Sequence, residues 1–198
     1  MPKTWTIFRS FDWGSSKPFS VGWWGVSDGN IFPPGTMIRL HEWYGCTEKP
    51  NTGLNMPNTE IGRKIIEISD EAFGKGRVQP GPADPSIFTE SGGKSIAEQM
   101  GIRWERGNNK PGSRVAGVEL FREMLLTASD KEKYLPDKVP GIYVMENCRD
   151  YIRLIPNMPR SEKNPDDVNT DSEDHIWDET RYAILYGKRD VFFGGVMP

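Results

Sequence analysis

Apolar and polar residues alternate along the first part of the chain with the two-residue period that is typical of β-strands. The large apolar side chains that recur with this period are Trp5, Ile7, Phe11, Phe19, Val21 and Trp23. Aromatic and β-branched residues dominate, and a stretch rich in Gly, Ser, Lys and Pro separates the two runs. The pattern predicts a long β-hairpin over residues 5–26, in which the first strand ends at Asp12.

The carboxylate at the end of this apolar strand has two interpretations. Asp12 can simply cap the turn that it forms with Trp13 and Gly14, because Asp and Gly are good turn residues. It can also be a functional group, because a carboxylate at such a position loses solvation unless a cation or a hydrogen-bond donor meets it. The hairpin alone leaves both interpretations open.

Changes in the period of the apolar residues, together with capping residues, predict the positions of the later helices and strands. The stripe formed by Ile61, Ile65, Ile68 and Ala72 is the helical one. A strand is expected at 36–45, and helices are expected from 58 or 59 to about 73, from 95 to 100, and from 113 or 114 to about 126. Another strand is expected at 141–146, followed by a helix from 147 to 155 and a last helix that ends near 187.

The segment 77–88 has the sequence RVQPGPADPSIF and contains a second candidate carboxylate, Asp84. Pro80 and Pro82 exclude a long central strand, because each proline removes a backbone donor. Pro85 forces the residue before it, Asp84, into an extended conformation. We therefore expect a short strand or an extended segment that ends at Asp84.

The run Ser-Gly-Gly-Lys-Ser at 91–95 is not a phosphate-binding loop. Such a loop needs a glycine at position 88, which is Phe88 in this chain. Ser95 and Glu98 instead have the spacing of a helix capping box.

Composition limits the class of protein. A chain of 198 residues, 36% of them hydrophobic, with a mean hydropathy of -0.61, fits one globular domain and contains no apolar run long enough for a membrane helix. The N-terminus lacks the apolar core of a signal peptide, so a cytoplasmic location is expected. With a net charge of -3, any contact with nucleic acid must come from a local basic patch or from bound metal ions.

One local basic patch does occur, in the segment 101–114. Four cations stand there against one acid, and the four are Arg103, Arg106, Lys110 and Arg114. Gly and Asn residues indicate a loop or a hairpin. Such a segment is either an ordinary solvated loop or an arm that contacts phosphates.

Acids are concentrated near the C-terminus, where residues 162–179 contain eight acids and one lysine. Asp174 and Asp178 are four positions apart, and His175 and Asp178 are three apart, so each pair can share one face of a helix. The helix dipole favours acids in the first turn of a helix. That effect explains Asp174 better than it explains Asp178, which lies a full turn further along.

Three motifs together resemble a known family. The string DHIWDETRYA at 174–183 resembles the DHxxDxxRYA signature of the nuclease domain of phage terminase large subunits. Residues 83–88 resemble the middle carboxylate motif of that family, and residues 11–14 resemble its first motif. They occur in the order of the family and cover about residues 5–186. No Walker motif is present, so the chain resembles an excised nuclease half or a stand-alone product.

The resemblance implies an α/β fold of the ribonuclease-H-like type. That fold has a mixed sheet of order 3-2-1-4-5 flanked by helices, and the single nuclease domain would span residues 1–198 without an ATPase domain. The elements read from the sequence fit this order, with the strand at 141–146 as the fifth.

The resemblance also implies a metal-dependent endonuclease that hydrolyses phosphodiester bonds of double-stranded DNA during phage genome packaging. Two Mg²⁺ or Mn²⁺ ions suit this chemistry, because these cations prefer carboxylate oxygen and stabilise charge on the attacking and leaving oxygens. Asp12, Asp84 and Asp178 would be the ligands, with Asp174 in reserve. His175 would orient the nucleophilic water, support a ligand or serve a structural role.

Two other functions remain open. One is a different ribonuclease-H-like enzyme, such as a junction resolvase or an integrase. The other is a DNA-binding or docking module of the packaging motor without catalysis; metal binding at the three carboxylates distinguishes this module from an enzyme. The partners that the resemblance implies are double-stranded DNA, the terminase ATPase domain, the small terminase subunit and the portal.

Overall fold

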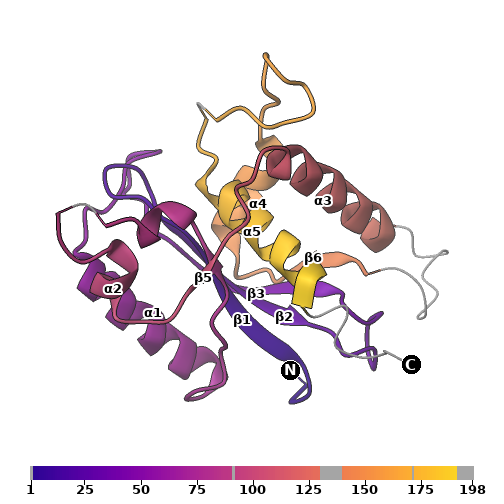
Figure 1. Cartoon of the computed structure of the whole chain (residues 1–198). Helices are drawn as coiled ribbons and strands as arrows, with labels where there is room; N and C mark the ends of the chain where they lie inside the picture. The colour runs from indigo at the N-terminus through magenta and orange to yellow at the C-terminus, as the bar shows by residue number, and fades with distance from the viewer. Residues whose placement is uncertain (1, 91, 130–139, 171, 191–198) are drawn as a thin grey trace.

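A mixed six-stranded β-sheet forms the centre of the molecule (Figure 1). The structure is a computed structural model, and it describes residues 2–90, 92–129, 140–170 and 172–190. The strands follow the order β5-β4-β1-β2-β3-β6 across the sheet. Their bounds are Thr6–Asp12 (β1), Ser20–Val26 (β2), Met37–Tyr44 (β3), Pro82–Ala83 (β4), Glu105–Arg106 (β5) and Ile142–Val144 (β6).

The predicted hairpin is confirmed and forms the middle of the sheet. β1 and β2 pair antiparallel over their whole length, from Thr6 opposite Val26 to Asp12 opposite Ser20. β3 continues the antiparallel order beside β2. β4 lies on the other side of β1 and runs parallel to it, with Phe11 opposite Ala83. Asp12 therefore lies at the carboxyl end of a central strand.

The expected order 3-2-1-4-5 is confirmed, but the fifth strand is not the one that the sequence suggested. Residues 142–144 pair parallel with β3 and extend the opposite edge. The place beside β4 belongs to Glu105–Arg106, whose backbone pairs parallel with β4. The loop or hairpin expected at 101–114 is corrected accordingly: part of that segment is a two-residue parallel strand, too short to produce a periodic signal.

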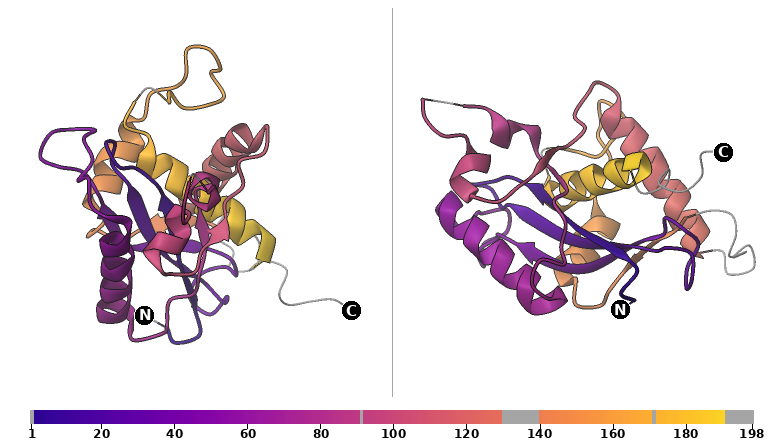
Figure 2. Two further views of the ribbon diagram at one scale, coloured as in Figure 1. Left: turned by 60° about the vertical axis from the view of Figure 1, so that its left-hand side comes forward. Right: turned by 60° about the horizontal axis from the view of Figure 1, so that its bottom comes forward.

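Helices cover both faces of the sheet (Figure 2). α1 and α2 lie on one face, and α3, α4 and α5 lie on the other. The predicted capping box of Ser95 and Glu98 begins α2. None of the described helices is long and apolar enough to cross a membrane. The bounds are Asn58–Phe73 (α1), Ile96–Met100 (α2), Ser113–Ser129 (α3), Arg149–Leu154 (α4) and His175–Asp190 (α5), with 3-10 turns at Pro85–Phe88 (η1) and Ile155–Asn157 (η2).

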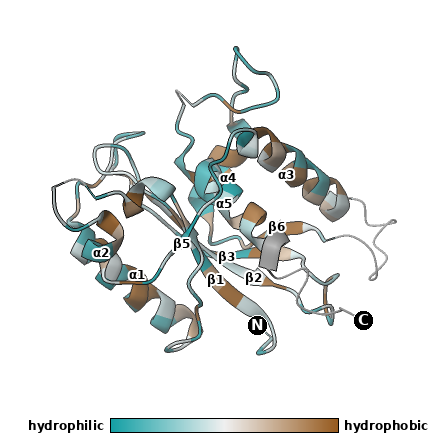
Figure 3. Cartoon of the chain, viewed as in Figure 1, coloured by the Kyte–Doolittle hydropathy of each residue, from teal (hydrophilic) through white to brown (hydrophobic). Residues whose placement is uncertain are grey.

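The two faces of β1 contribute to two separate apolar cores. Phe11 belongs to the core under α1 and α2, whereas Phe8 packs toward α3, α4 and α5. Figure 3 shows apolar residues as bands along the strands and the helices. Because side chains alternate along a strand, Asp12 shares the face of Phe8 and points toward the α5 side of the sheet.

Candidate active site

Parallel pairing of β1 and β4 brings the first two predicted carboxylates together. The backbone N–H of Asp84 donates to the carbonyl of Phe11 at 2.9 Å, which places Asp84 beside Asp12. Asp84 is half-buried and caps the 3-10 turn η1, because its carboxylate accepts from the backbone N and from Oγ of Ser86 at 2.9 and 2.6 Å. The expected position of Asp84 at the end of a short strand is thus confirmed.

The start of α5 brings the remaining predicted residues to the same edge of the sheet. His175 Nδ1 lies 3.2 Å from Asp12 Oδ2. Asp174 immediately precedes the helix, and its carbonyl accepts the backbone N–H of Asp178 at 2.9 Å, so the two acids are one turn apart. Residues from β1, from the end of β4 and from α5 therefore gather at one place.

The acids at this edge repel one another. Burial, together with the charges of Asp178, Asp84 and Asp174, raises the pKa of Asp12 well above its usual range. Burial and the neighbouring Asp178 raise the pKa of Asp174 to about 6. Burial lowers the pKa of His175, although Asp174 and Asp178 act in the opposite direction. Each of these shifts favours the uncharged form of the group relative to the same group in water.

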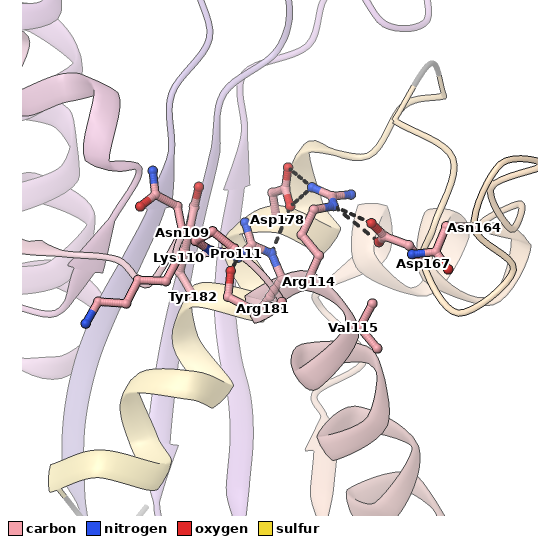
Figure 4. Close-up of a pocket in the computed structure, with 12 residues that line it drawn as sticks. Asn109, Lys110, Pro111, Arg114, Val115, Asn164, Asp167, Asp178, Arg181 and Tyr182 are labelled. Atoms are coloured by element: carbon pink, nitrogen blue, oxygen red, sulfur yellow. Dashed lines mark hydrogen bonds and ion pairs between the residues drawn. The ribbon is translucent and has the colours of Figure 1, made fainter.

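Two arginines neutralise Asp178 (Figure 4). Nη1 of Arg114 contacts both carboxylate oxygens of Asp178, at 2.7 and 3.0 Å. Nε of Arg181 donates to Oδ1 of Asp178 at 3.1 Å. Arg114 also donates from Nε to Asp167 at 2.9 Å and lies 3.6 Å from Asp174. Asp178 therefore shares its edge of the sheet with two guanidinium groups as well as with the other acids.

The gathered side chains do not yet surround a common point. Among the residues that the structure describes, no group of three or more His, Cys, Asp or Glu side chains is arranged to hold a metal ion. The hydrogen bonds explain this arrangement, because the Asp178 oxygens are directed at Arg114 and Arg181 and the Asp84 oxygens at Ser86.

The four cations predicted to bind DNA differ in their surroundings. Arg106 is exposed and lies over the ring of Phe88 at 4.6 Å, and the carbonyl of Arg103 accepts from buried Arg9 at 2.7 Å. Lys110 lines a cavity of about 440 Å³ beside Asp178 and extends away from the carboxylates (Figure 4). Arg114 is the exception, since its guanidinium is already paired with acids.

Glu179 is a residue whose role the sequence did not reveal. It is fully buried against the sheet, where its carboxylate forms an ion pair with the fully buried Arg39. It also accepts from Ser10 and, at 2.9 Å, from Trp24 Nε1. A Cβ at Gly22 would collide with this carboxylate, so the glycine makes room for it. This network fixes α5 on the sheet and thereby positions the adjacent Asp178.

Comparison with solved structures defines the class of this fold. The structure of the large terminase from a thermophilic bacteriophage in complex with ADP is similar, with a TM-score of 0.65 at 19% sequence identity, over 98% of this chain and 42% of that chain. The same terminase in complex with ATP-gamma-S gives a TM-score of 0.64 at 18% identity, over 94% of this chain and 41% of that one.

A shorter structure narrows the comparison to one domain. The P22 large terminase nuclease domain matches 96% of this chain and 88% of its own length, with a TM-score of 0.59 and 12% identity. The chain therefore has the fold of a terminase nuclease domain, and it spans about two fifths of the large terminase from the thermophilic phage. No model of a known protein family matches the sequence, and no curated protein matches it.

Proposed function

We propose that this domain is a divalent-metal-dependent endonuclease that hydrolyses double-stranded DNA during phage genome packaging. The observation that carries the proposal is the gathering of Asp12, Asp84 and Asp178 at one edge of a sheet with the terminase nuclease fold. Three separate elements contribute these acids, although their mutual repulsion is unfavourable for folding. A chemical role for the acids accounts for that arrangement.

The donor set suits Mg²⁺ or Mn²⁺, because these cations prefer carboxylate oxygen. The raised pKa of Asp12 supports the same assignment, since a divalent cation would relieve the repulsion that raises it. In this proposal Asp12, Asp84 and Asp178 hold two ions, with Asp174 as a further ligand. Such ions supply a reactive water at neutral pH and stabilise charge on the attacking and leaving oxygens.

His175 is proposed to accept a proton from the attacking water. The lowered pKa of its imidazole keeps the ring neutral near pH 7. When Nδ1–H donates to ionised Asp12, Nε2 retains a lone pair and can accept a proton. Glu179 contributes indirectly, because its buried pair with Arg39 holds the helix that carries His175 and Asp178.

DNA phosphates are proposed to lie along the basic segment, where Arg106 and Lys110 present cations near the carboxylate edge and Arg103 lies further back, beside Arg9. Arg114 belongs to the same surface once its guanidinium is released from the acids. By analogy with the large terminases that share this fold, we propose that the domain works with a terminase ATPase domain, a small terminase subunit and the portal in the host cytoplasm.

Plasmid cleavage tests this function. In Mn²⁺ the wild-type chain is expected to nick and linearise supercoiled plasmid, and EDTA is expected to stop the reaction. Asp12→Asn should reduce the rate by at least about a hundredfold, because it removes the ligand at the centre of the cluster.

Asp166→Asn is the matched control, because Asp166 is an exposed acid of the C-terminal acidic stretch outside the cluster. It should cleave at the wild-type rate. A wild-type chain that binds DNA but never cuts it would instead support the docking module, and an Asp12→Asn variant with full activity would exclude the proposed site.

A further inference from the structure

Arg114 contacts three acids at once. Its Nη1 contacts both oxygens of Asp178, its Nε contacts both oxygens of Asp167, and its Nη2 lies 3.6 Å from Asp174. The three acids come from the loop before α5 and from its first turn, whereas Arg114 comes from the first turn of α3. Planar guanidinium groups are suited to such paired contacts with carboxylates.

The second arginine on Asp178 is held much more firmly. Arg181 is 3% exposed, and its Nη1 donates to the carbonyl of Asn108 at 2.9 Å. Its aliphatic chain packs where a Cβ at Gly117 would collide with it. Arg114, by contrast, has a side chain that is 27% exposed and lines the cavity of about 440 Å³. Of the two arginines, Arg114 is therefore the one that can be displaced from Asp178.

We infer that Arg114 competes with divalent cations for the Asp178 carboxylate and acts as a displaceable internal counter-cation. The inference rests on the proposed function, because Asp178 is a metal ligand only under that proposal. Arg114 and Arg181 together occupy three of the roughly four lone-pair sites of the Asp178 carboxylate, and the Arg114 guanidinium also repels a cation that approaches the remaining site, so metal binding at Asp178 favours the departure of Arg114.

The cavity beside Asp178 offers a place for the Arg114 side chain after it has been displaced. The cavity beside Asp178 is lined by Lys110 and by the first residues of α3, and it retains Asp167 as a partner for Arg114. A DNA phosphate near Lys110 would attract the freed guanidinium. Binding of DNA and loading of metal on Asp178 would then favour each other.

The affinity for Mn²⁺ in the absence of DNA tests the competition. Arg114→Gln should bind Mn²⁺ about tenfold more tightly than wild type by electron paramagnetic resonance titration, because one partly exposed charge-assisted contact no longer has to be broken. Arg122→Gln removes the same charge from an exposed position two turns further along α3 and should leave the affinity unchanged. Arg114→Lys keeps the charge without the planar fork and should fall between wild type and Arg114→Gln.

A titration of the wild-type chain with Mg²⁺ gives a readout that needs no variant. The Arg114 Nε–H resonance should shift with metal saturation, whereas that of Arg122 should not. An unchanged Arg114 resonance, or an Arg114→Gln affinity equal to or weaker than wild type, would overturn the inference. Absence of Mn²⁺ binding in every variant would overturn both the inference and the metal site, whereas tighter binding without DNA cleavage would uphold the inference and remove only the nuclease.

Discussion

The Asp12 side chain is buried and faces Asp84, Asp174 and Asp178, with Arg181 as the cation that opposes their effect. Its raised pKa means that the folded chain holds the Asp12 proton more tightly than the unfolded chain does. Above that raised pKa the ionised carboxylate destabilises the folded state. At a pH below the pKa of an ordinary aspartate, the group is protonated in both states and the effect disappears.

Asp12→Asn should therefore stabilise the chain in the absence of divalent cations, and the gain should depend on pH. At pH 8 we expect the free energy of unfolding to rise by about 1 kcal/mol. The gain should shrink as the pH falls through the raised pKa of Asp12 toward the ordinary aspartate range. Urea unfolding of both proteins at a series of pH values measures this difference. A variant that is less stable than wild type at pH 8 would show that Asp12 is satisfied by its neighbours rather than repelled by them.

Individual carboxylates were partly predictable because their positions follow from local patterns. The alternation along β1 placed Asp12 at a strand end, and Pro85 placed Asp84 after a short extended segment. The partners of these acids were not predictable in the same way. Arg114 meets Asp178 across 64 positions of sequence, and Glu179 meets Arg39 across 140. Only Arg181, three positions after Asp178 on the same helix, had a spacing that could have revealed its contact.

Among the elements, the basic segment around β5 is the one whose proposed role, contact with DNA phosphates, can be tested separately from the carboxylate site. Pairing with β4 places Arg106 beside the strand that leads to Asp84. Lys110 continues the cationic surface along the cavity next to α3. Phosphate contacts dominate non-specific DNA affinity and weaken as salt rises. This segment is consequently where we expect most of the salt dependence of DNA binding to arise.

Replacing Arg103, Arg106 and Lys110 by Ala should weaken binding to all DNA sequences. The slope of log affinity against log salt should become shallower by about 0.9 for each phosphate that the altered side chains no longer reach. Binding measured at several salt concentrations, in the presence of Ca²⁺ to prevent cleavage, provides the test. A control triple variant at Lys49, Lys75 and Arg122 removes three exposed cations elsewhere and should keep the wild-type slope. Equal slopes for all three proteins would locate the DNA on another face.

The long elements were predictable, whereas the pairing of the short strands was not. The helices at 58–73 and 113–129 have apolar stripes that persist over several turns, and the hairpin has a clear two-residue period. β4 and β5 contain two residues each, and their pairing depends on backbone contacts between distant segments. The edge of the sheet that β6 joins was also unpredictable, since a short apolar run does not specify its neighbour.

At the scale of the whole molecule, a fold known from large terminases places a cluster of acids next to a basic segment. The chain carries a net charge of -3, so any attraction to DNA has to be local. Its sequence identity to the similar structures is only 12% to 19%, and the likeness therefore extends to the fold alone. The proposed nuclease function depends on whether Asp12, Asp84 and Asp178 bind divalent metal ions.

Anomalous diffraction from crystals of the wild-type chain soaked in Mn²⁺ tests this most directly. We predict manganese density in contact with Asp12 and at least one of Asp84 and Asp178, with the Arg114 guanidinium turned away from Asp178. Manganese bound only at other positions, with the Arg114–Asp178 pair intact under saturating metal, would contradict the account.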